Sequence, residues 1–381
     1  MKQSIRLGSV RGIAVGVHWS VGVILVLFAW ELAEYQLPAD PGHAGAGDWV
    51  AGVVGAVALL ASLLAHELAH ALVARRSGVR VRSITLFVFG GLTQLEGEAH
   101  TPGADFRIAA VGPATSLVLA GVLGAADALA RVGSVHGLPT ATLSWLWEVN
   151  LLLAGFNLVP AAPLDGGRIL RAALWRHWGS RTRAALASTR VGRWFGILLV
   201  FLGVLGVLAV GITGLWAALI GVFLYASAVS EEQYELVEDA LSGLTVGEVM
   251  FPDPPTVLPS TSGADLLALF QWRYRGDAVV VTDPLGAAPV GVVTTRVMRR
   301  IDPEQQRAAD AGHLAVPLAE LVRCRPEEPA GPLLPRIAAH GGHPAVVFDS
   351  TGRLVGLVSL ADLERAAAWA TARRRRTLLR R

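Results

Sequence analysis

The amino-acid sequence predicts a polytopic α-helical membrane protein with about six transmembrane helices and a membrane-associated β-hairpin, followed by a soluble α/β domain. Composition is the first reason, because 53% of the 381 residues are hydrophobic and 17% are charged, against about 25% charged residues in soluble domains. The second reason is a series of apolar runs, since about 18 apolar residues suffice to cross a bilayer. The third is a change near Leu244, where short strands and helices separated by prolines replace the apolar runs.

Each expected transmembrane helix corresponds to one apolar run, and the last two runs are separated only by the turn GITG. The expected spans are residues 13–30, 49–73, 108–129, 143–159, 194–210 and 215–228. Between the second and third runs, Ile84, Leu86 and Val88 alternate with Thr85, Phe87 and Phe89. This alternation, broken by Gly90-Gly91, predicts a short hairpin over residues 82–96 and not another helix.

Positive charge predicts the topology. Arginines and lysines flank the first run at residues 2–11, follow the second at 75–82, and follow the fourth at 168–193. These segments therefore belong on the cytoplasmic side of a plasma membrane, with both termini cytoplasmic. The net charge is only +3, so we interpret the arginines as topology signals and expect no direct nucleic-acid partner. No small-residue cleavage site follows the long first run, so we expect no cleavable signal peptide, and the single Cys324 excludes an intrachain disulfide.

The second run contains LLAHELAHAL at residues 63–72. His66 and His70 are four residues apart, so a helix places both imidazoles on one face. This is the H-E-x-x-H arrangement, in which two histidines hold Zn²⁺ and the glutamate, here Glu67, activates the bound water. Each ionisable group in a membrane costs about 2.5 to 3.5 kcal/mol, so three of them need a compensating partner, which a metal supplies. The alternative is a set of pore-facing or core polar residues.

A hydrolytic zinc site takes three protein ligands and leaves a fourth position for water. The best candidate for the third ligand is Asp165 in FNLVPAAPLDGGRIL, just after the fourth run. Pro160 and Pro163 favour a helix break there, and non-helical backbone is tolerated at membrane depth where it lines a wet cavity. Taken alone, Asp165 would be an ordinary loop carboxylate.

Together, HELAH, FNLVPAAPLDGGRIL, VHWS (17–20) and GP (112–113) resemble the site-2 protease family of intramembrane zinc metalloproteases, over residues 1 to about 230. The resemblance implies that Asp165 is the third zinc ligand and that Asn157 donates a hydrogen bond to the scissile carbonyl or its oxyanion. It also implies cleavage of substrates within or near a transmembrane helix, usually after another protease has trimmed them. In bacteria such substrates are anti-sigma or pro-sigma factors. The hairpin pairs with the unwound substrate as an added strand, or else forms a lid or re-entrant loop.

The soluble region contains an internal repeat. Residues 277–298 and 344–363 both follow the order strand, turn, strand, helix, about 66 residues apart, which predicts two copies packed together. They resemble cystathionine-β-synthase (CBS) domains, which often bind adenosine nucleotides. The second copy matches the ribose-binding run of that family with Ser359 and Asp362, whereas the first has Val297 where the aspartate belongs. One nucleotide site is therefore expected; the alternative is a docking or dimerisation surface that would give a homodimer.

These observations divide the chain into a metalloprotease domain (1–230), a linker (231–243), tandem CBS domains (244–368) and a basic tail (369–381) that is solvated or lies on anionic lipid. The leading interpretation is a zinc-dependent peptidase of regulated intramembrane proteolysis whose activity the CBS domains modulate. The alternative is a catalytically inactive membrane protein that senses a metal or a nucleotide.

Overall fold

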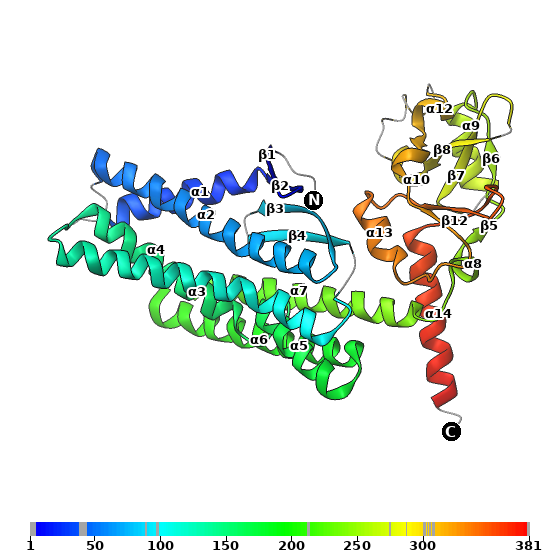
Figure 1. Cartoon of the computed structure of the whole chain (residues 1–381). Coiled ribbons are helices and arrows are strands. Elements are labelled where there is room, and N and C mark those ends of the chain that lie inside the picture. Colours follow the sequence, from blue (N-terminus) through cyan, green and yellow to red (C-terminus); the bar gives the residue numbers. More distant parts are fainter. Residues whose placement is uncertain are drawn as a thin grey trace. The chain divides into compact units, whose positions relative to one another are not determined.

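The computed structural model describes residues 5–37, 44–87, 90–96, 99–211, 214–273, 276–286, 288–299, 302, 304, 306 and 309–378. The chain divides into two compact units, Met1–Gln233 and Tyr234–Arg381 (Figure 1). Helix α7 (Gly214–Leu241) passes from one unit to the other, so residues 231–241 of the expected linker are helical.

A mixed sheet opens the first unit, with strand order β1-β2-β3-β4. β2 pairs antiparallel with β1 and parallel with β3, and β3 pairs antiparallel with β4. Buried apolar side chains of β2 and β3 pack on Ala71, the residue after His70, so the sheet lies against the HELAH turn. β4 is left as an edge strand. The strands are β1 (Ile5–Val10), β2 (Ile13–Val17), β3 (Arg80–Phe87) and β4 (Gly90–Glu96).

The predicted hairpin is therefore confirmed as β3 and β4, but its bend was misplaced. Gly90 and Gly91 lie within β4, where they pair with Phe87 and Leu86. Val88 and Phe89, part of the predicted alternation, lie outside the described residues. Gly91 serves close packing, because a Cβ there would lie 2.1 Å from Cγ of Glu67.

The remaining elements of the first unit are helices, of which α2, α3, α6 and α7 are, among the described residues, long and apolar enough to cross a membrane. Six spans are thus not confirmed. The first run begins as strand β2, which shortens α1, and the polar residues Glu148, Asn150 and Asn157 lower the hydropathy of α4 without breaking the helix. The helices are α1 (Ser20–Glu31), η1 (Leu32–Gln36), α2 (Ala46–Arg76), α3 (Pro102–Val132), α4 (Leu138–Asn157), α5 (Asp165–Trp178), α6 (Arg181–Val210) and α7.

Local signals set the ends of α2. At its start, the Asp48 carboxylate accepts a hydrogen bond of 2.8 Å from the Gly45 N–H. At its end, Arg75 and Arg76 occupy the last turn, where cations favour the negative end of the helix dipole. Gly78 then adopts φ +83°, which reverses the chain into β3. The HELAH motif lies two turns before this end.

Helices α6 and α7 form a close antiparallel pair (Figure 1). A Cβ atom on Gly203 would lie 2.3 Å from the backbone nitrogen of Ala218, and one on Gly221 would lie 2.6 Å from that of Val200. Small residues allow this approach, as is usual between membrane helices. Arg193 of α6 donates a hydrogen bond of 2.8 Å to Glu232 of α7, which holds the pair together beyond the apolar stretch.

The second unit confirms the internal repeat. Each copy contributes an antiparallel strand pair followed by a helix, in sheets of order β6-β7-β8-β9 and β10-β11-β12-β5. The strands of the first sheet are Thr256–Val257, Ala278–Thr282, Pro289–Thr294 and Val316–Pro317, and those of the second are Arg323–Cys324, Ala345–Phe348, Leu354–Val358 and Phe251–Pro252. The helices are α8 (Val246–Val249), α9 (Gly263–Ala268), η3 (Leu269–Arg273), α10 (Thr295–Met298), α12 (Ala311–Leu314), η4 (Leu318–Glu320), α13 (Leu333–Ala339) and α14 (Leu360–Leu378).

The two copies interlock. β5, which precedes the first copy, pairs with β12 of the second. Buried Val280 and Val292 of the first sheet pack with Val346 and Leu357 of the second in one cluster. The copies therefore share a core, as expected for a paired module.

Candidate metal centre

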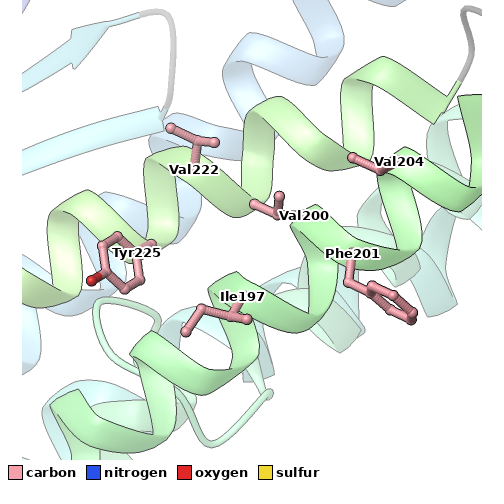
Figure 2. A pocket seen from close by; sticks show the side chains of 6 residues that line it. All are labelled: Ile197, Val200, Phe201, Val204, Val222 and Tyr225. Carbon is pink, nitrogen blue, oxygen red and sulfur yellow. The ribbon is translucent and has the colours of Figure 1, made fainter.

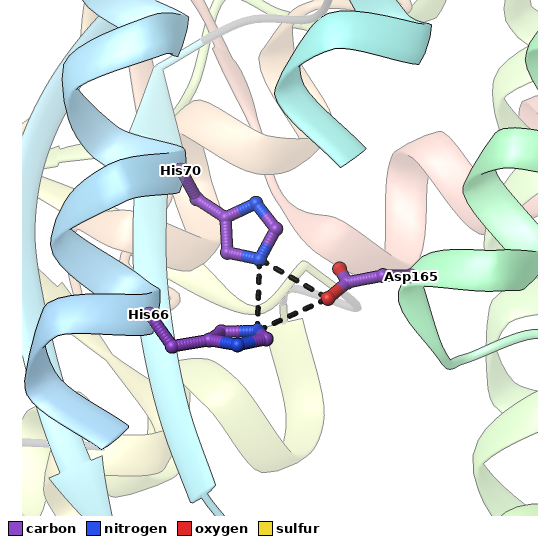
Figure 3. A group of neighbouring side chains, drawn as sticks. All are labelled: His66, His70 and Asp165. Atoms are coloured by element: carbon purple, nitrogen blue, oxygen red, sulfur yellow. Dashed lines mark hydrogen bonds and ion pairs between the residues drawn. The ribbon is translucent and has the colours of Figure 1, made fainter. Parts of the chain in front are cut away.

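His66, His70 and Asp165 converge at one point of the first unit (Figure 3). The two Nε2 atoms are 3.1 Å apart, and each lies 3.1 Å from Oδ2 of Asp165. Both histidines are buried, and the Asp165 side chain is 13% exposed. Helix α2 supplies the imidazoles and the first residue of α5 supplies the carboxylate, 99 residues further along the chain than His66.

Helix α3 orients both imidazoles. Nδ1 of His70 lies 2.6 Å from the carbonyl oxygen of Ile108. A carbonyl only accepts, so this Nδ1 carries the proton and the neutral ring presents a lone pair at Nε2. Nδ1 of His66 lies 2.9 Å from Oγ of Ser116, two turns further along α3. Both Nε2 atoms therefore face Asp165, as metal ligands require.

The donor set fits zinc. Zinc binds nitrogen and oxygen at about 2.0–2.2 Å in tetrahedral sites, which places neighbouring donors about 3.3 Å apart, close to the 3.1 Å observed here. Gly112 of α3 leaves the space, since a Cβ there would lie 2.1 Å from Nε2 of His70 and 2.6 Å from Nε2 of His66. Three protein donors leave the fourth position to water or substrate, as in hydrolytic sites.

The segment between α4 and α5 explains the sequence LDGG. Helix α4 ends at Asn157, the chain turns through a cis Ala162–Pro163 peptide, and α5 begins at Asp165, so the predicted helix break is confirmed. A Cβ on Gly166 would lie 2.2 Å from the Val159 carbonyl oxygen, and one on Gly167 would lie 2.4 Å from the Ala162 nitrogen. Both glycines are needed for the turn to pack closely against the start of α5, which places Asp165 next to the two histidines.

All the residues predicted for this site line one cavity of about 540 Å³. Glu67 lies beside the histidines on α2, and Asn157 faces the cavity from the end of α4. Edge strand β4 passes directly over Glu67, because a Cβ on Gly91 would lie 2.1 Å from its Cγ. A candidate base, a candidate oxyanion donor and a metal donor set therefore line the same cavity.

Comparisons with known proteins agree with this geometry. The family model described as peptidase family M50 matches residues 54–132 and 128–200, and that of the CBS domain matches 246–302. Rip3 of Mycobacterium tuberculosis is 42% identical over 370 residues, covering 96% of this chain and 93% of that protein. The chain belongs to peptidase family M50. It is also 29% identical to zinc metalloprotease MJ0392 of Methanocaldococcus jannaschii over 282 residues, 74% of this chain and 76% of the relative.

Among solved structures, the site-2 protease from Methanocaldococcus jannaschii covers 60% of this chain and 94% of its own, at 26% identity and a TM-score of 0.43. The resemblance drawn from the sequence motifs is thus confirmed by the family match. The M50 chain is a multi-pass membrane zinc metalloprotease of the site-2 type that carries a CBS domain. This identity, with the metal donor set intact, favours the peptidase over the inactive-sensor alternative.

Several residues of this M50 site could not be predicted from the sequence. Ser116 supports His66, Arg168 lines the cavity one turn after Asp165, and α7 covers it with Phe223, Leu224 and other residues. Of the residues that surround the metal ligands, Gly112 alone was indicated by the sequence, through the GP motif at residues 112–113. The others have ordinary local sequence, and folding alone brings them to the site.

A second cavity in the protease unit has a different character. It measures about 520 Å³, lies between α6 and α7, and is lined by Ile197, Val200, Phe201, Val204, Val222 and Tyr225 (Figure 2). Its lining has no charged side chain and no metal-ligating group. Such a lining suits contact with hydrocarbon, and it lacks the groups that hydrolyse a peptide bond.

The CBS unit contains a polar cleft of about 570 Å³ between its copies. Ser359 lines this cleft with Thr294, Arg296 and Arg299. Asp362 instead has a local structural role, because its Oδ2 accepts hydrogen bonds from the backbone N–H and hydroxyl of Ser359, at 2.8 and 2.6 Å, and so helps to cap α14. Its other oxygen pairs with a neighbouring arginine.

Proposed function

We propose that this protease hydrolyses peptide bonds within or near transmembrane segments of membrane proteins, with zinc held by His66, His70 and Asp165. The observation that carries the proposal is the three-donor cluster, 3.1 Å between each pair of donor atoms, inside a unit whose long helices are apolar enough for a bilayer. Donors buried among such helices would let the reaction reach a peptide bond that soluble proteases cannot contact.

The proposed chemistry divides the work among the cavity residues. Bound zinc would polarise the scissile carbonyl and lower the pKa of the attacking water to about 7. Glu67 accepts the proton of that water and returns it to the departing amine. The Asn157 amide donates a hydrogen bond to the developing oxyanion, an interaction that contributes about 3 kcal/mol in other hydrolases.

A substrate helix must unwind before its backbone can be attacked, and β4 offers the unwound segment a partner. β4 is the edge strand of the sheet, and its Gly91 packs against Glu67. An extended segment added to β4 would therefore run past the proposed base. Thr93→Cys should crosslink to a cysteine placed in the cleaved segment of a substrate. Crosslinking that is equal for cleavable and uncleavable segments would contradict strand addition.

We further propose that the CBS unit binds an adenosine nucleotide and thereby modulates cleavage. The cleft beside Ser359 is lined by Arg296 and Arg299, which favour a phosphate. Calorimetry with AMP and ATP on the full chain should detect binding that Arg299→Glu weakens at least tenfold. Arg353→Glu, an exposed change outside the cleft lining, is the control. No binding by the wild type would leave the unit as a docking or dimerisation surface.

The arginine distribution supports a plasma-membrane protein with both termini in the cytoplasm. Anti-sigma or pro-sigma factors are then the proposed substrates. We also propose that the CBS unit forms the contact of a homodimer. Proteomics of a strain that produces only the Glu67→Gln variant should reveal accumulated membrane-bound fragments of the true substrate. Sigma-regulator fragments would support this assignment, and their absence among the accumulated proteins would contradict it.

The hydrolytic assignment is tested with purified full-length protein. The wild type, Glu67→Gln and Glu148→Gln are compared for zinc content and for cleavage of a membrane-embedded substrate. Glu148 is an exposed acid on α4 outside the cavity lining, so its variant is the matched control. We expect equal zinc in all three and loss of cleavage, by at least a thousandfold, in Glu67→Gln alone. Cleavage by Glu67→Gln at the wild-type rate would refute the assigned base.

A further inference from the structure

One face of α3 carries the described contacts of both Nδ1 atoms of the two ligand histidines. The Ile108 carbonyl holds His70, Gly112 makes room between the imidazoles, and Ser116 holds His66. These positions are spaced by four residues, so they form a single stripe along the helix. α3 donates none of the three metal ligands, yet it fixes the orientation of two of them.

The same stripe continues to Asp105, one turn before Ile108. Asp105 is 1% exposed and lies in the first turn of α3, where the helix dipole favours a negative charge. Its carboxylate accepts two hydrogen bonds from Arg171: Nε donates to Oδ2 and Nη2 donates to Oδ1, each at 2.9 Å. Nη2 of Arg168 lies 3.5 Å from Oδ1. The pair is therefore bidentate, and the side chains of Arg171 and Asp105 are only 11% and 2% exposed.

Arg171 belongs to α5, the helix that begins with Asp165. Among the described residues, the polar contacts of the Asp165 carboxylate are its 3.1 Å approaches to the two imidazole Nε2 atoms, so its own helix gives it no side-chain support. Where the carboxylate lies thus depends on where α5 is held. The Asp105–Arg171 pair holds α5 to α3 two turns from Asp165.

We propose that Asp105 and Arg171 are positioning residues that set the third metal ligand, as Ile108 and Ser116 set the histidines. The proposal rests on the proposed function in one respect, that Asp165 binds the metal. α3 would then be a template that orients all three ligands while supplying none. A bidentate arginine–carboxylate pair suits this role because it fixes both the distance and the angle between two helices.

The energetics favour positioning over plain stabilisation. Desolvation of two buried charges largely cancels their attraction, so such pairs contribute little net stability compared with apolar packing. Metal sites respond differently, because outer-shell changes typically weaken metal affinity by 10- to 100-fold. A lysine at position 171 keeps the charge but loses the fork, so it should release the orientation of α5 while preserving the ion pair.

The test measures zinc affinity of the full-length protein by competition with a chelator, separately from activity. Asp105→Asn and Arg171→Lys should each weaken zinc binding by 10- to 100-fold. Glu231→Gln is the matched control, since Glu231 lies 4.0 Å from the guanidinium of Arg171. The zinc affinity of this variant should stay within threefold of the wild type. Cobalt-substituted protein gives a second signal: the two variants should shift its visible ligand-field bands, and the control should not.

A merely structural pair would lower the melting temperature of the metal-free protein and leave the zinc affinity of the folded fraction unchanged, which would overturn the proposal. If Asp105→Asn does not fold, Arg171→Lys alone decides between these results. Asp165→Asn distinguishes a failure of the proposed metal site from a failure of the positioning role alone. If it binds zinc like the wild type, the proposed metal site fails; if it loses zinc while Asp105→Asn and Arg171→Lys retain it, only the positioning role fails.

Discussion

Gly112→Ala should weaken zinc binding by more than 100-fold although it adds a single methyl group. The new Cβ would lie 2.1 Å from Nε2 of His70 and 2.6 Å from Nε2 of His66. Ordinary contact begins near 3.4 Å, so relieving the closer clash requires a displacement of about 1.3 Å, the difference between 3.4 and 2.1 Å. Metal–ligand distances tolerate only about 0.2 Å. The methyl group also occupies the space between the donors that a metal needs.

We expect zinc affinity to fall by more than 100-fold, since the change acts on the ligands themselves and not on their supports. Zinc stoichiometry by mass spectrometry and affinity by chelator competition check this, with cleavage of a membrane-embedded substrate as a separate measurement. Gly121→Ala is the control on the same helix, because no atom lies within 4 Å of the added Cβ there.

The control should bind zinc normally and should be slightly more stable, because alanine is a better helix former than glycine by about 0.5–1 kcal/mol. The reasoning is refuted if Gly112→Ala retains one zinc per chain with wild-type affinity. That result would mean that the imidazoles do not face Gly112. Loss of zinc in both variants would instead show that α3 tolerates no added methyl group, and the specific role of Gly112 would fail.

Three other predictions follow from local geometry. Gly91→Ala places a Cβ 2.1 Å from Cγ of Glu67, so cleavage should fall at least tenfold with zinc content unchanged; loss of zinc would place the effect elsewhere. Burial raises the pKa of the Cys324 thiol to about 12, so it should resist alkylation at pH 8 until the CBS unit is unfolded. Because the folded unit retains this proton, its stability should fall as the pH rises above about 9, and rapid native alkylation would contradict both. Gly192→Ala brings a Cβ within 2.0 Å of the Ala162 carbonyl oxygen and should cost about 1–3 kcal/mol of stability; an unchanged melting temperature would contradict it.

The sequence predicts most of the metal centre because its chemistry is local. His66 and His70 share a face through helical periodicity alone, and the prolines after the fourth run mark the break before Asp165. The internal repeat is equally visible, because each copy repeats the same order of apolar strands. Such features depend on neighbours within a few residues, and the structure confirms them.

Boundaries set by distant partners could not be read in this way. Residues 13–17 look like the start of a helix, but they pair with β3, which lies more than 60 residues further along the chain. Gly90 and Gly91 look like a turn, yet strand pairing fixes them inside β4, where Gly91 makes room for Glu67. In each case a tertiary contact overrides the local signal.

The role of α3 shows what a buried metal site in a membrane requires beyond its ligands. An imidazole that binds metal through Nε2 leaves Nδ1 needing a partner, and hydrocarbon offers none. A neighbouring helix must therefore present a backbone carbonyl or a polar side chain to each ring, and a small residue where the rings pass closest. In α3 the Ile108 carbonyl and the Ser116 hydroxyl supply the two Nδ1 partners, and Gly112 between them leaves room for the imidazoles. Because this stripe of α3 contacts the histidines of the H-E-x-x-H helix directly, the two patterns should be sought together in a sequence.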